Sequence, residues 1–466
     1  MSQSNQYDLV VIGSGPGGEV GAIRAAQLGL KTALIEKEPH LGGTCLNWGC
    51  IPTKALLESA KTYQKLQHAH DLGFDIGSVS FDWERIMKRK EGIVDAQRKG
   101  LRFLMKKNKI DVFEGFGQLT GRGQVKVTYK DQKVPTTLST KYVLVATGSK
   151  IRTLPQLAAT NGKSIISSDD ILSITSIPQS LCVIGGGVVG TEFASLFARF
   201  GSRVTILEVA PQILPSEDSD TVKELLKSLK KQNVCVETGV KILKVEDRGD
   251  QAMVTTEGSE PRAFERVLLA VGRVPATENM GLEALGVKLE RGFLSVDEHY
   301  RTTAPGIYAI GDVIPTPMLA HTASAEAMHA VEHMAGKNPH PIEYQANPNA
   351  IYTYPEIASI GKTEQALKTE KKEYRVAQFP FAPMAKAKIE DATEGFIKII
   401  YGPKYREILG VHIVGAKATE MISEFALGRI LETTVDEIAH TIHPHPTMSE
   451  TIMEAAHIAL GGAVHL

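Results

Sequence analysis

The 466-residue sequence contains only four cysteines, has no excess of basic residues and has no apolar run long enough to span a bilayer. So few cysteines in a chain of this length argue against a secreted scaffold held together by disulfides. The formal net charge of -1 gives no field that would attract nucleic acid or an acidic membrane surface. A strand-like run starts at Tyr7, which argues against a signal peptide. We therefore expect a cytoplasmic protein with no nucleic-acid partner, no membrane association and no metal site.

Two of the cysteines, Cys45 and Cys50, lie in the run LGGTCLNWGCIPTK at residues 41–54 and can close a small disulfide loop. The three glycines of this run allow the backbone to turn tightly around them. Pro52 suits the first turn of a helix, which the apolar spacing after Cys50 predicts. A helix N-terminus and the nearby Lys54 both favour thiolate over thiol, as a redox-active sulfur requires. The alternative is a structural disulfide or two inert buried cysteines, and a structural disulfide is unusual in a reducing compartment.

A glycine-rich turn stands between two predicted strands near the N-terminus. The apolar run at residues 7–12 leads into Gly13, Gly15 and Gly18, which match G-x-G-x-x-G, and a helical pattern follows. A second strand at residues 32–35 ends in Glu36. This is the context of a dinucleotide-binding fingerprint, in which the glycines admit a pyrophosphate to the helix N-terminus. Glu36 falls where a carboxylate holds the ribose hydroxyls.

The same unit occurs a second time, beginning with the strand-like run at residues 181–184. The residues that correspond without a gap are Gly13, Gly15, Gly18, Gly29 and Glu36 in the first copy and Gly185, Gly187, Gly190, Gly201 and Glu208 in the second. The repeat predicts two dinucleotide-binding domains, and two dinucleotides suggest an electron relay. Because the first fingerprint closely precedes the cysteines, we expect FAD there and a nicotinamide nucleotide at the second.

Glu208 favours NAD over NADP at the second site, because a carboxylate accepts from a free 2′-hydroxyl and repels a 2′-phosphate. Residues 209–212 contain no Arg or Lys to bind such a phosphate. The alternative is that Glu208 only closes a strand at the surface. The remaining two cysteines, Cys182 and Cys235, lie in strand-like runs and are expected to be core residues.

Further predicted strands end in glycine turns at residues 142–149, 267–275 and 307–312. The carboxyl ends of strands in a doubly wound sheet face the ligand crevice, so Asp312 is a candidate for contacts to the flavin's ribityl or phosphate groups. Its alternative role is to cap the helix predicted at residues 321–334. Residues 70–110 are expected to be a charged helical insertion over the first domain. From residue 346 the pattern changes to α+β, with strands at 394–401 and 408–415 and helices at 418–431 and 435–440.

Near the end of the chain, His445 and Glu450 form a candidate acid–base pair. Pro446 stiffens the turn after His445, and Glu450, at the start of a predicted helix, can reach back to it. A histidine oriented by a carboxylate works near neutral pH, and dithiol chemistry needs a base to remove a thiol proton. The alternative is a surface histidine beside a helix-capping glutamate.

These motifs together resemble the flavoprotein disulfide reductases over nearly the whole length. The residues that carry the resemblance are 42–54, both fingerprints, Ala146–Gly148, Gly311–Asp312 and residues 445–450. The resemblance implies an α/β fold with two Rossmann-like domains, for FAD and NAD, and a C-terminal α+β dimerisation domain. It implies four segments: FAD-binding 1–150, NAD-binding 151–270, a central domain 271–345 that completes the FAD site, and an interface domain 346–466.

Residue roles are also implied by the resemblance. Cys45 is the sulfur that exchanges with substrate, Cys50 lies nearer the flavin, and His445 with Glu450 serves the disulfide of the other subunit in a homodimer. Lys54 and Glu192 resemble the family's ion pair beside the flavin. The resemblance places the following residues on the cofactor sites: Gly13, Gly15, Pro16, Gly17, Gly18, Glu36, Lys37, Gly43, Thr44, Lys54, Gly117, Ala146, Thr147, Gly148, Gly185, Gly187, Val188, Val189, Gly190, Glu192, Glu208, Gly272, Arg273, Gly311, Asp312, Met318, Leu319, Ala320 and His321.

Within the family, the sequence is most similar to the branch that oxidises dihydrolipoamide with NAD. Glutathione and trypanothione reductases carry basic residues where this chain has Glu208 to Gln212. Mercuric reductases and the large thioredoxin reductases add a C-terminal cysteine or selenocysteine pair, and this sequence ends in GGAVHL. The resemblance implies the lipoyl domains and core of 2-oxoacid dehydrogenase complexes as partners, with a glycine cleavage complex as a further candidate. Two alternatives remain: a reductase of another disulfide, similar to glutathione reductase, and a non-catalytic docking subunit.

Overall fold

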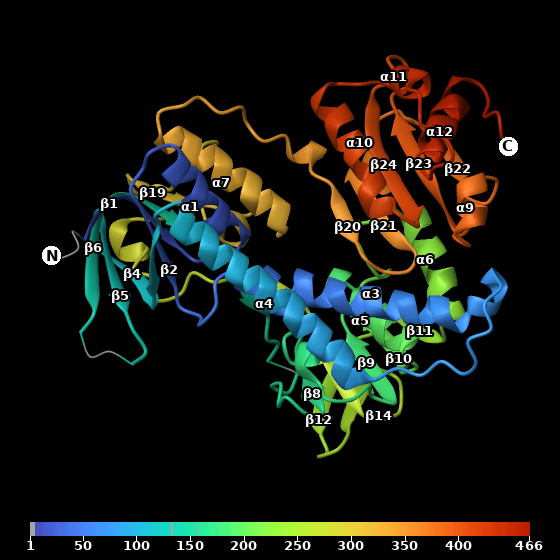
Figure 1. Cartoon of the computed structure of the whole chain (residues 1–466), viewed down its shortest axis with the longest axis horizontal. Coiled ribbons are helices and arrows are strands. Elements are labelled where there is room, and N and C mark those ends of the chain that lie inside the picture. The colour runs from blue at the N-terminus through green and yellow to red at the C-terminus, as the bar shows by residue number, and fades with distance from the viewer. Residues whose placement is uncertain (1–4, 132–133, 156) are drawn as a thin grey trace. The chain divides into compact units, whose positions relative to one another are not determined.

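The computed structural model describes residues 5–131, 134–155 and 157–466. The chain forms two compact units (Figure 1). Unit 1 comprises Met1–Leu56, Asp82–Thr153 and Gly272–Ile342, and unit 2 comprises Leu57–Phe81, Leu154–Val271 and Glu343–Leu466. Each unit is therefore assembled from three separate stretches of sequence.

Unit 1 is built on a seven-stranded sheet. Its parallel part contains β3 (Asp111–Glu114), β2 (Thr32–Glu36), β1 (Gln6–Ile12), β6 (Thr136–Val145) and β19 (Ile307–Ala309), and β4 (Phe116–Gly121) and β5 (Gln124–Thr128) continue it in antiparallel order. Helices α1 (Pro16–Gln27) and α7 (Ala320–Met334) pack side by side (Figure 1). Because β19 pairs with β6, residues after the second fingerprint complete the first domain's sheet.

Three helices follow β2 in the chain. The short α2 (Gly43–Trp48) and the long α3 (Cys50–Gln67) carry the cysteine motif, and α4 (Trp83–Lys107) is the charged helix that the sequence predicted between residues 70 and 110. The side chain of Asp82 caps α4 by accepting from the backbone N–H of Arg85. Val94 and Met105 on its inner face join the core of unit 1.

Residues 57–81, which the sequence analysis assigned to the first segment, cluster with unit 2. Aromatic packing accounts for this: the ring of Phe81 lies 5.0 Å from that of Phe200 and 4.9 Å from that of Tyr63. The finer division of the chain into four segments stays a prediction.

Unit 2 contains a five-stranded parallel sheet in the order β11 (Val234–Thr238), β10 (Arg203–Glu208), β9 (Ser180–Ile184), β15 (Arg266–Leu269) and β8 (Ile165–Ile166). Helices α5 (Val188–Arg199) and α6 (Ser219–Lys231) connect its strands, and β12 (Ile242–Asp247), β13 (Ala252–Thr256) and β14 (Arg262–Phe264) form a separate antiparallel sheet. Cys182 is fully buried in β9, as expected, whereas Cys235 in β11 is exposed.

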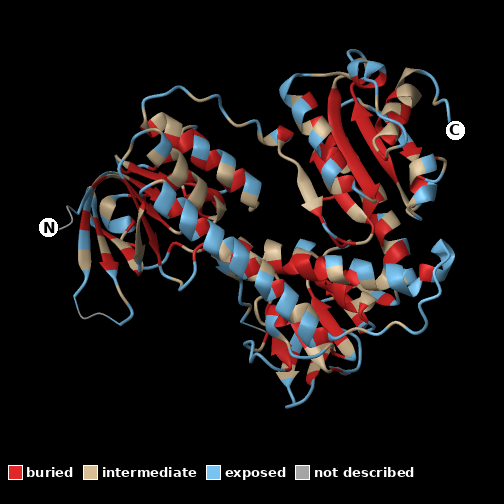
Figure 2. Ribbon diagram, viewed as in Figure 1, coloured by how far each residue is buried: buried red, intermediate tan, exposed pale blue. Residues whose placement is uncertain are grey.

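The C-terminal part of unit 2 is an antiparallel sheet in the order β20 (Asn349–Ile351), β21 (Glu356–Gly361), β24 (Ile408–Gly415), β23 (Gly395–Tyr401) and β22 (Arg375–Pro380). Helices α10 (Ala418–Ile430), α11 (Val435–His440) and α12 (Glu450–Leu460) share its hydrophobic core (Figure 2). The strands and helices predicted after residue 390 are thus confirmed within about a residue at each end.

The remaining elements are short. They are β7 (Ser149–Ile151) paired with β16 (Arg273–Pro275), β17 (Leu289–Glu290) paired with β18 (Phe293–Leu294), α8 (Glu364–Glu370), α9 (Ala385–Ile389), and five 3₁₀ turns: η1 (Ala69–Leu72), η2 (Asp170–Ser173), η3 (Glu283–Leu285), η4 (Gly311–Val313) and η5 (Tyr344–Ala346). Among the described residues, no helix combines the length and apolarity needed to cross a membrane.

Candidate active site

The two fingerprint loops have the same backbone geometry. Gly13 and Gly185 have φ angles of +100° and +107°, and a Cβ added to either would lie 2.3 Å from a backbone oxygen, that of Ala146 or that of Ala270. A Cβ added to Gly18 would lie 1.9 Å from the oxygen of Gly13. Only glycine is compatible with such approaches, so these positions hold each loop in the tight turn that a dinucleotide-binding fingerprint requires.

The helices that follow both loops begin without a side-chain cap. Gly15 precedes α1 and Gly187 precedes α5, each with extended backbone and no side-chain hydrogen bond to the first turn. Their backbone N–H groups can therefore face a phosphate, as in other helix N-termini that bind anions.

Glu36 and Glu208 occupy equivalent places at the ends of β2 and β10. Glu36 Oε2 accepts from the backbone N–H of Ser14 at 2.9 Å, and Glu208 Oε2 accepts from the N–H of Gly186 at 2.6 Å. The second carboxylate oxygen of each accepts from the N–H two residues further on, at 2.9 and 2.7 Å. Both side chains are buried, so neither glutamate merely closes a strand at the surface. Each carboxylate stands beside its glycine loop, where it could receive a ribose hydroxyl.

The cysteine motif lies against the first fingerprint loop. A Cβ added to Gly43 would lie 2.6 Å from the Cα of Gly15, so the start of α2 touches the start of α1. The amide of Asn47 donates to the carbonyls of Leu41 and Gly43 at 3.0 and 2.9 Å, and its oxygen accepts from Arg98 at 2.7 Å. These bonds fix the loop between the two cysteines. The sequence analysis missed Asn47 and Arg98, because only the fold brings α4 to this loop.

Cys45 and Cys50 are in side-chain contact as thiols. The hydrogen bond to Cys50 and burial both raise the pKa of the Cys45 thiol, and the charge of Glu19 raises it further, while Lys54 lowers it. Lys54 thus favours the thiolate, as expected. In the dithiol form the other effects outweigh it, and the net pKa of Cys45 is raised. The raised pKa follows from two thiols that share one hydrogen bond, since removal of the first proton opposes removal of the second.

Asp312 is hydrogen-bonded to Ser149, which no sequence pattern marked as a site residue. Ser149 Oγ donates to Asp312 Oδ2 at 2.5 Å, and Arg273 donates to the same hydroxyl at 2.7 Å and to the Ser149 carbonyl at 2.8 Å. Arg273 also reaches Thr44 Oγ1 at 3.4 Å. Asp312 does not cap α7, whose N-cap is Leu319, so the alternative role is wrong. A serine after Gly148 gives no distinctive sequence signal, because the bond is made across 163 residues.

The His445–Glu450 pair is formed as expected. His445 Nδ1 lies 2.9 Å from Glu450 Oε1, and the other carboxylate oxygen accepts from the Thr447 N–H at 2.9 Å. Partial burial raises the pKa of Glu450, but the bonds from Thr447 and His445 outweigh it, so the net pKa lies below its usual value. The imidazole of His445 is 72% exposed, which leaves its Nε2 accessible.

Glu192 is the residue that the family resemblance pairs with Lys54. Its carboxylate accepts from the backbone N–H of Tyr352 at 2.9 Å, within unit 2. The Lys54–Glu192 ion pair itself stays a prediction, as do the roles given to the other cofactor residues. Of these, Gly117 lies in β4, Gly272 and Arg273 lie at β16, and Met318 to His321 lead into α7.

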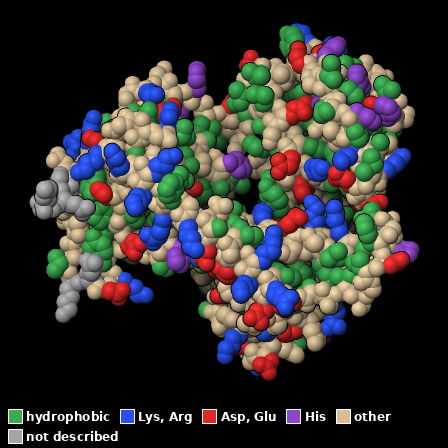
Figure 3. Space-filling view, viewed as in Figure 1, with side chains coloured by type: hydrophobic (Ala, Val, Ile, Leu, Met, Phe, Trp, Pro, Cys, Tyr) green, Lys and Arg blue, Asp and Glu red, His purple; other side chains and the backbone are tan. Residues whose placement is uncertain are grey.

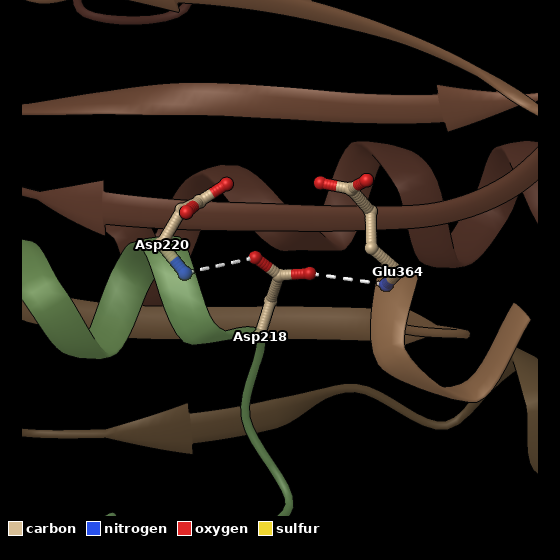
Figure 4. Close-up of side chains that lie close together, drawn as sticks. All are labelled: Asp218, Asp220 and Glu364. Carbon is tan, nitrogen blue, oxygen red and sulfur yellow. Dashed lines mark hydrogen bonds between the residues drawn. The ribbon is translucent and has the colours of Figure 1, made fainter. Parts of the chain in front are cut away.

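Asp218, Asp220 and Glu364 gather their carboxylates in one place in unit 2 (Figure 4). The centre of this group is taken by the ammonium of Lys398, which is 2.8 Å from Asp218, 2.8 Å from Asp220 and 2.5 Å from Glu364. Lys398 is only 1% exposed. The cluster is therefore a buried ion-pair network that ties α6 and α8 to β23, and its cation is supplied by the chain itself.

On the face drawn in Figure 3, acidic and basic side chains are intermixed, which agrees with the net charge of -1.

Two family models match the chain: Pyridine nucleotide-disulphide oxidoreductase over residues 7–327, and the dimerisation domain of the same family over residues 347–456. The chain belongs to the pyridine nucleotide-disulphide oxidoreductase family. Members of this family are flavoprotein oxidoreductases, and FAD and NAD are the cofactors of this fold.

Curated proteins similar in sequence to this chain are named dihydrolipoyl dehydrogenases. The chain is 43% identical to a dihydrolipoyl dehydrogenase of Bacillus subtilis, with 99% of this chain and 100% of the relative covered. It is 41% identical to mitochondrial dihydrolipoyl dehydrogenase 2 of Arabidopsis thaliana, covering 100% of this chain and 92% of that protein. Among solved structures, LpdA from Mycobacterium tuberculosis superposes with a TM-score of 0.91 at 29% identity, covering 97% and 99% of the two chains. The flavoprotein disulfide reductase RclA from Escherichia coli gives 0.88 at 27% identity, covering 97% and 99%.

Proposed function

We propose that the chain oxidises dihydrolipoyl groups to lipoyl groups and reduces NAD, the reaction for which its relatives are named. The observation that carries the proposal is the contact between the Cys45–Cys50 motif and the first fingerprint loop, through Gly43 and Gly15. This contact supports thiol chemistry beside a bound dinucleotide. The similarity to dihydrolipoyl dehydrogenases over the full length of the chain supports the choice of substrate.

The residues present fit FAD at the first loop and NAD at the second. A Cβ added to Gly187 would meet nothing within 4 Å and one added to Gly15 would meet only the Cα of Gly43 at 4.0 Å, so each loop leaves space beside its middle glycine. Both loops also have an anchored carboxylate, Glu36 or Glu208. In unit 1, the hydroxyl of Ser149 donates to Asp312 and accepts from Arg273, which gives a set of hydrogen-bonded polar side chains that suits the flavin site. FAD bound at the first loop would supply two-electron transfer between the cysteine pair and NAD.

The cysteine pair in its disulfide form takes the electrons from the substrate. His445 Nε2 removes a proton from one substrate thiol, and the resulting thiolate attacks Sγ of Cys45. The Cys45–Cys50 bond breaks and Cys50 leaves as a thiolate. His445 releases the first proton to solvent and then takes the proton of the second substrate thiol. The resulting thiolate attacks the substrate sulfur bound to Cys45, so that cyclic lipoamide forms and Cys45 leaves as a thiolate. The substrate dithiol is thereby oxidised and the enzyme disulfide reduced.

We also propose that the protein acts as a homodimer and serves 2-oxoacid dehydrogenase complexes through their lipoyl domains. The match of residues 347–456 to a dimerisation domain supports the dimer. In this arrangement the partner subunit's His445 acts at the disulfide.

The test is NADH formation from NAD and dihydrolipoamide by the purified protein, with NADP and glutathione as controls. Fast NADH formation with NAD alone is the expected result. Activity restricted to NADP and another disulfide would overturn the proposed substrate, and would point to the glutathione reductase-like alternative.

A further inference from the structure

His443, two residues before the proposed base His445, has no part in the reaction described above. Its Nδ1 lies 3.0 Å from the carbonyl oxygen of Thr441, and its Nε2 lies 3.0 Å from Oε1 of Glu424 in α10. The side chain of His443 is only 3% exposed, against 72% for that of His445. Of the two histidines that flank Pro444, one is therefore held inside the protein at both ring nitrogens, and the other is open to solvent.

Both neighbours of the His443 ring are hydrogen-bond acceptors. A backbone carbonyl has no proton to donate, and an ionised carboxylate only accepts. A neutral imidazole has one N–H and can satisfy only one of these acceptors, so the two contacts together favour the imidazolium. The bond to Glu424 is the largest influence on the pKa of His443 and raises it, as do the Thr441 carbonyl and the charges of Glu424 and Glu450, whereas burial lowers it. His443 is thus a donor at both nitrogens and not a second base.

The bond to Glu424 ties the turn between α11 and α12, which carries the proposed base, to α10. Glu424 and His443 lie 19 residues apart, and α10 belongs to the hydrophobic core of the C-terminal sheet. Thr447 forms bonds inside the turn, from its N–H to Glu450 and from its hydroxyl to the carbonyl of Pro444. These local bonds set the shape of the turn, whereas the bond from His443 sets its place on α10.

We propose that His443 is a positioning residue for His445: its bond to Glu424 holds the turn where Nε2 of His445 can take the proton of a substrate thiol. This role rests on the proposed function, in which His445 is the base, and it gives His443 no contact with substrate. A displacement of about 1 Å at a reacting group can cost about a hundredfold in rate. Loss of the bond should therefore slow proton removal and leave both dinucleotide loops intact, because neither loop includes residues of this turn.

The experiment removes the bond from each side in turn. His443→Asn keeps an amide N–H near the place of Nδ1 but is too short to reach Glu424, and Glu424→Ala removes the acceptor on α10. Glu424→Gln is the conservative variant, since its amide oxygen still accepts from Nε2 of His443. Glu420→Ala is the matched control, because Glu420 is an exposed glutamate in the first turn of α10.

Two reactions of the FAD-containing protein are compared. NADH formation from NAD and dihydrolipoamide needs a base for the substrate thiols, whereas reduction of ferricyanide by NADH involves no thiol substrate. His443→Asn and Glu424→Ala should each lower kcat of the first reaction about tenfold and leave the second reaction and the KM for NAD unchanged. Glu424→Gln should recover most of the lost rate, and Glu420→Ala should match the native protein. Because both changes remove the same bond, a protein carrying His443→Asn and Glu424→Ala together should be no slower than the slower single variant.

Hydrogen exchange followed by mass spectrometry measures the turn itself. The peptide that spans residues 441–450 should exchange faster in His443→Asn and in Glu424→Ala than in the native protein, whereas peptides from β23 should not change. If His443→Asn fails to fold, Glu424→Ala removes the same bond by altering a partly exposed side chain and still decides the matter.

An unchanged kcat for dihydrolipoamide in Glu424→Ala, or an equal loss of both reactions, would overturn the positioning role of His443. Unchanged exchange of residues 441–450 in Glu424→Ala would overturn it as well. A native protein that reduces ferricyanide with NADH but forms no NADH from dihydrolipoamide would instead refute the proposed function, and would leave His443 no base to position.

Discussion

The Nδ1 atom of His445 lies 2.9 Å from Oε1 of Glu450 across a single turn of chain. An ionised carboxylate only accepts hydrogen bonds, so in the neutral imidazole Nδ1 is the nitrogen that carries the proton and Nε2 keeps its lone pair. Because the ring is 72% exposed, that lone pair faces outward from unit 2. Nε2 is thus the atom of this pair at which a proton from outside can be accepted.

His445→Gln should lower kcat for dihydrolipoamide oxidation by about a hundredfold or more, since a positioned general base contributes that order of rate. FAD content, read from the flavin absorbance, should stay unchanged because unit 1 holds the flavin fingerprint. His440→Gln, an exposed histidine on α11, is the control and should be nearly fully active. An equal loss of rate and FAD would make His445 a structural residue.

Cys45→Ser should keep FAD and abolish turnover of dihydrolipoamide, because a hydroxyl cannot form the mixed disulfide. Activity is measured as NADH formation, and flavin content by absorbance. Cys235→Ser is the matched control. Cys235 is an exposed residue of unit 2, and partial shielding of its sulfur from water together with the nearby Glu237 raises its thiol pKa, which lowers its thiolate fraction. Full activity in Cys45→Ser would contradict the proposed exchange.

Glu208→Ala should weaken NAD binding about tenfold and reduce the preference for NAD over NADP. The carboxylate is held by the N–H groups of Gly186 and Ala210, and its removal deletes the acceptor for the ribose hydroxyls. KM values for NAD and NADP, measured at saturating dihydrolipoamide, check this prediction. Glu257→Ala alters an exposed glutamate paired with Lys241 and should change neither value. Unchanged NAD affinity in Glu208→Ala would mean that the ribose binds elsewhere.

The sequence was informative wherever a local pattern dictates the backbone. The G-x-G-x-x-G repeats predicted both cradles, since no other residue than glycine is compatible with the approach of Gly13 to Ala146 or of Gly185 to Ala270. The spacing of His445 and Glu450 predicted their bond because a short turn joins them. In each case the signal itself is local: a glycine pattern that recurs at a fixed offset, or two residues that lie five apart.

Contacts made only by the tertiary fold could not be predicted. Ser149 reaches Asp312 across 163 residues, and Lys398 reaches Asp218 across 180. No periodicity or motif marks either pair. The stacking of Tyr63 on Phe200 within unit 2 is missed for the same reason, because it depends on the path of the chain between them.

The buried network around Lys398 makes a prediction about stability. Burial alone would lower the pKa of Lys398, but its bonds to Asp218, Asp220 and Glu364 outweigh it and the net pKa is raised. The bond from Lys398 is the largest influence on the pKa of Asp220 and lowers it. Burial is the largest single influence on Asp218 and Glu364 and would raise their pKa values, but the bond from Lys398 and the other bonds and charges around them together outweigh it, so all three carboxyls have pKa values below their usual range. Carboxyls with lowered pKa values contribute stability above their unfolded pKa, and this is lost as the pH falls through the folded values.

Lys398→Met should therefore lower the thermal midpoint of unfolding by about 5 °C or more near pH 7, because it leaves buried carboxylates without their cation. The difference from the native protein should shrink as the pH falls toward 4, where the carboxyls of the variant become protonated. Lys231→Met is the control, since Lys231 is exposed and its surface ion pair with Glu394 should contribute little. Thermal unfolding followed by circular dichroism between pH 4 and pH 8 measures both. A Lys398→Met midpoint equal to that of Lys231→Met at pH 7 would show that the network does not stabilise the fold.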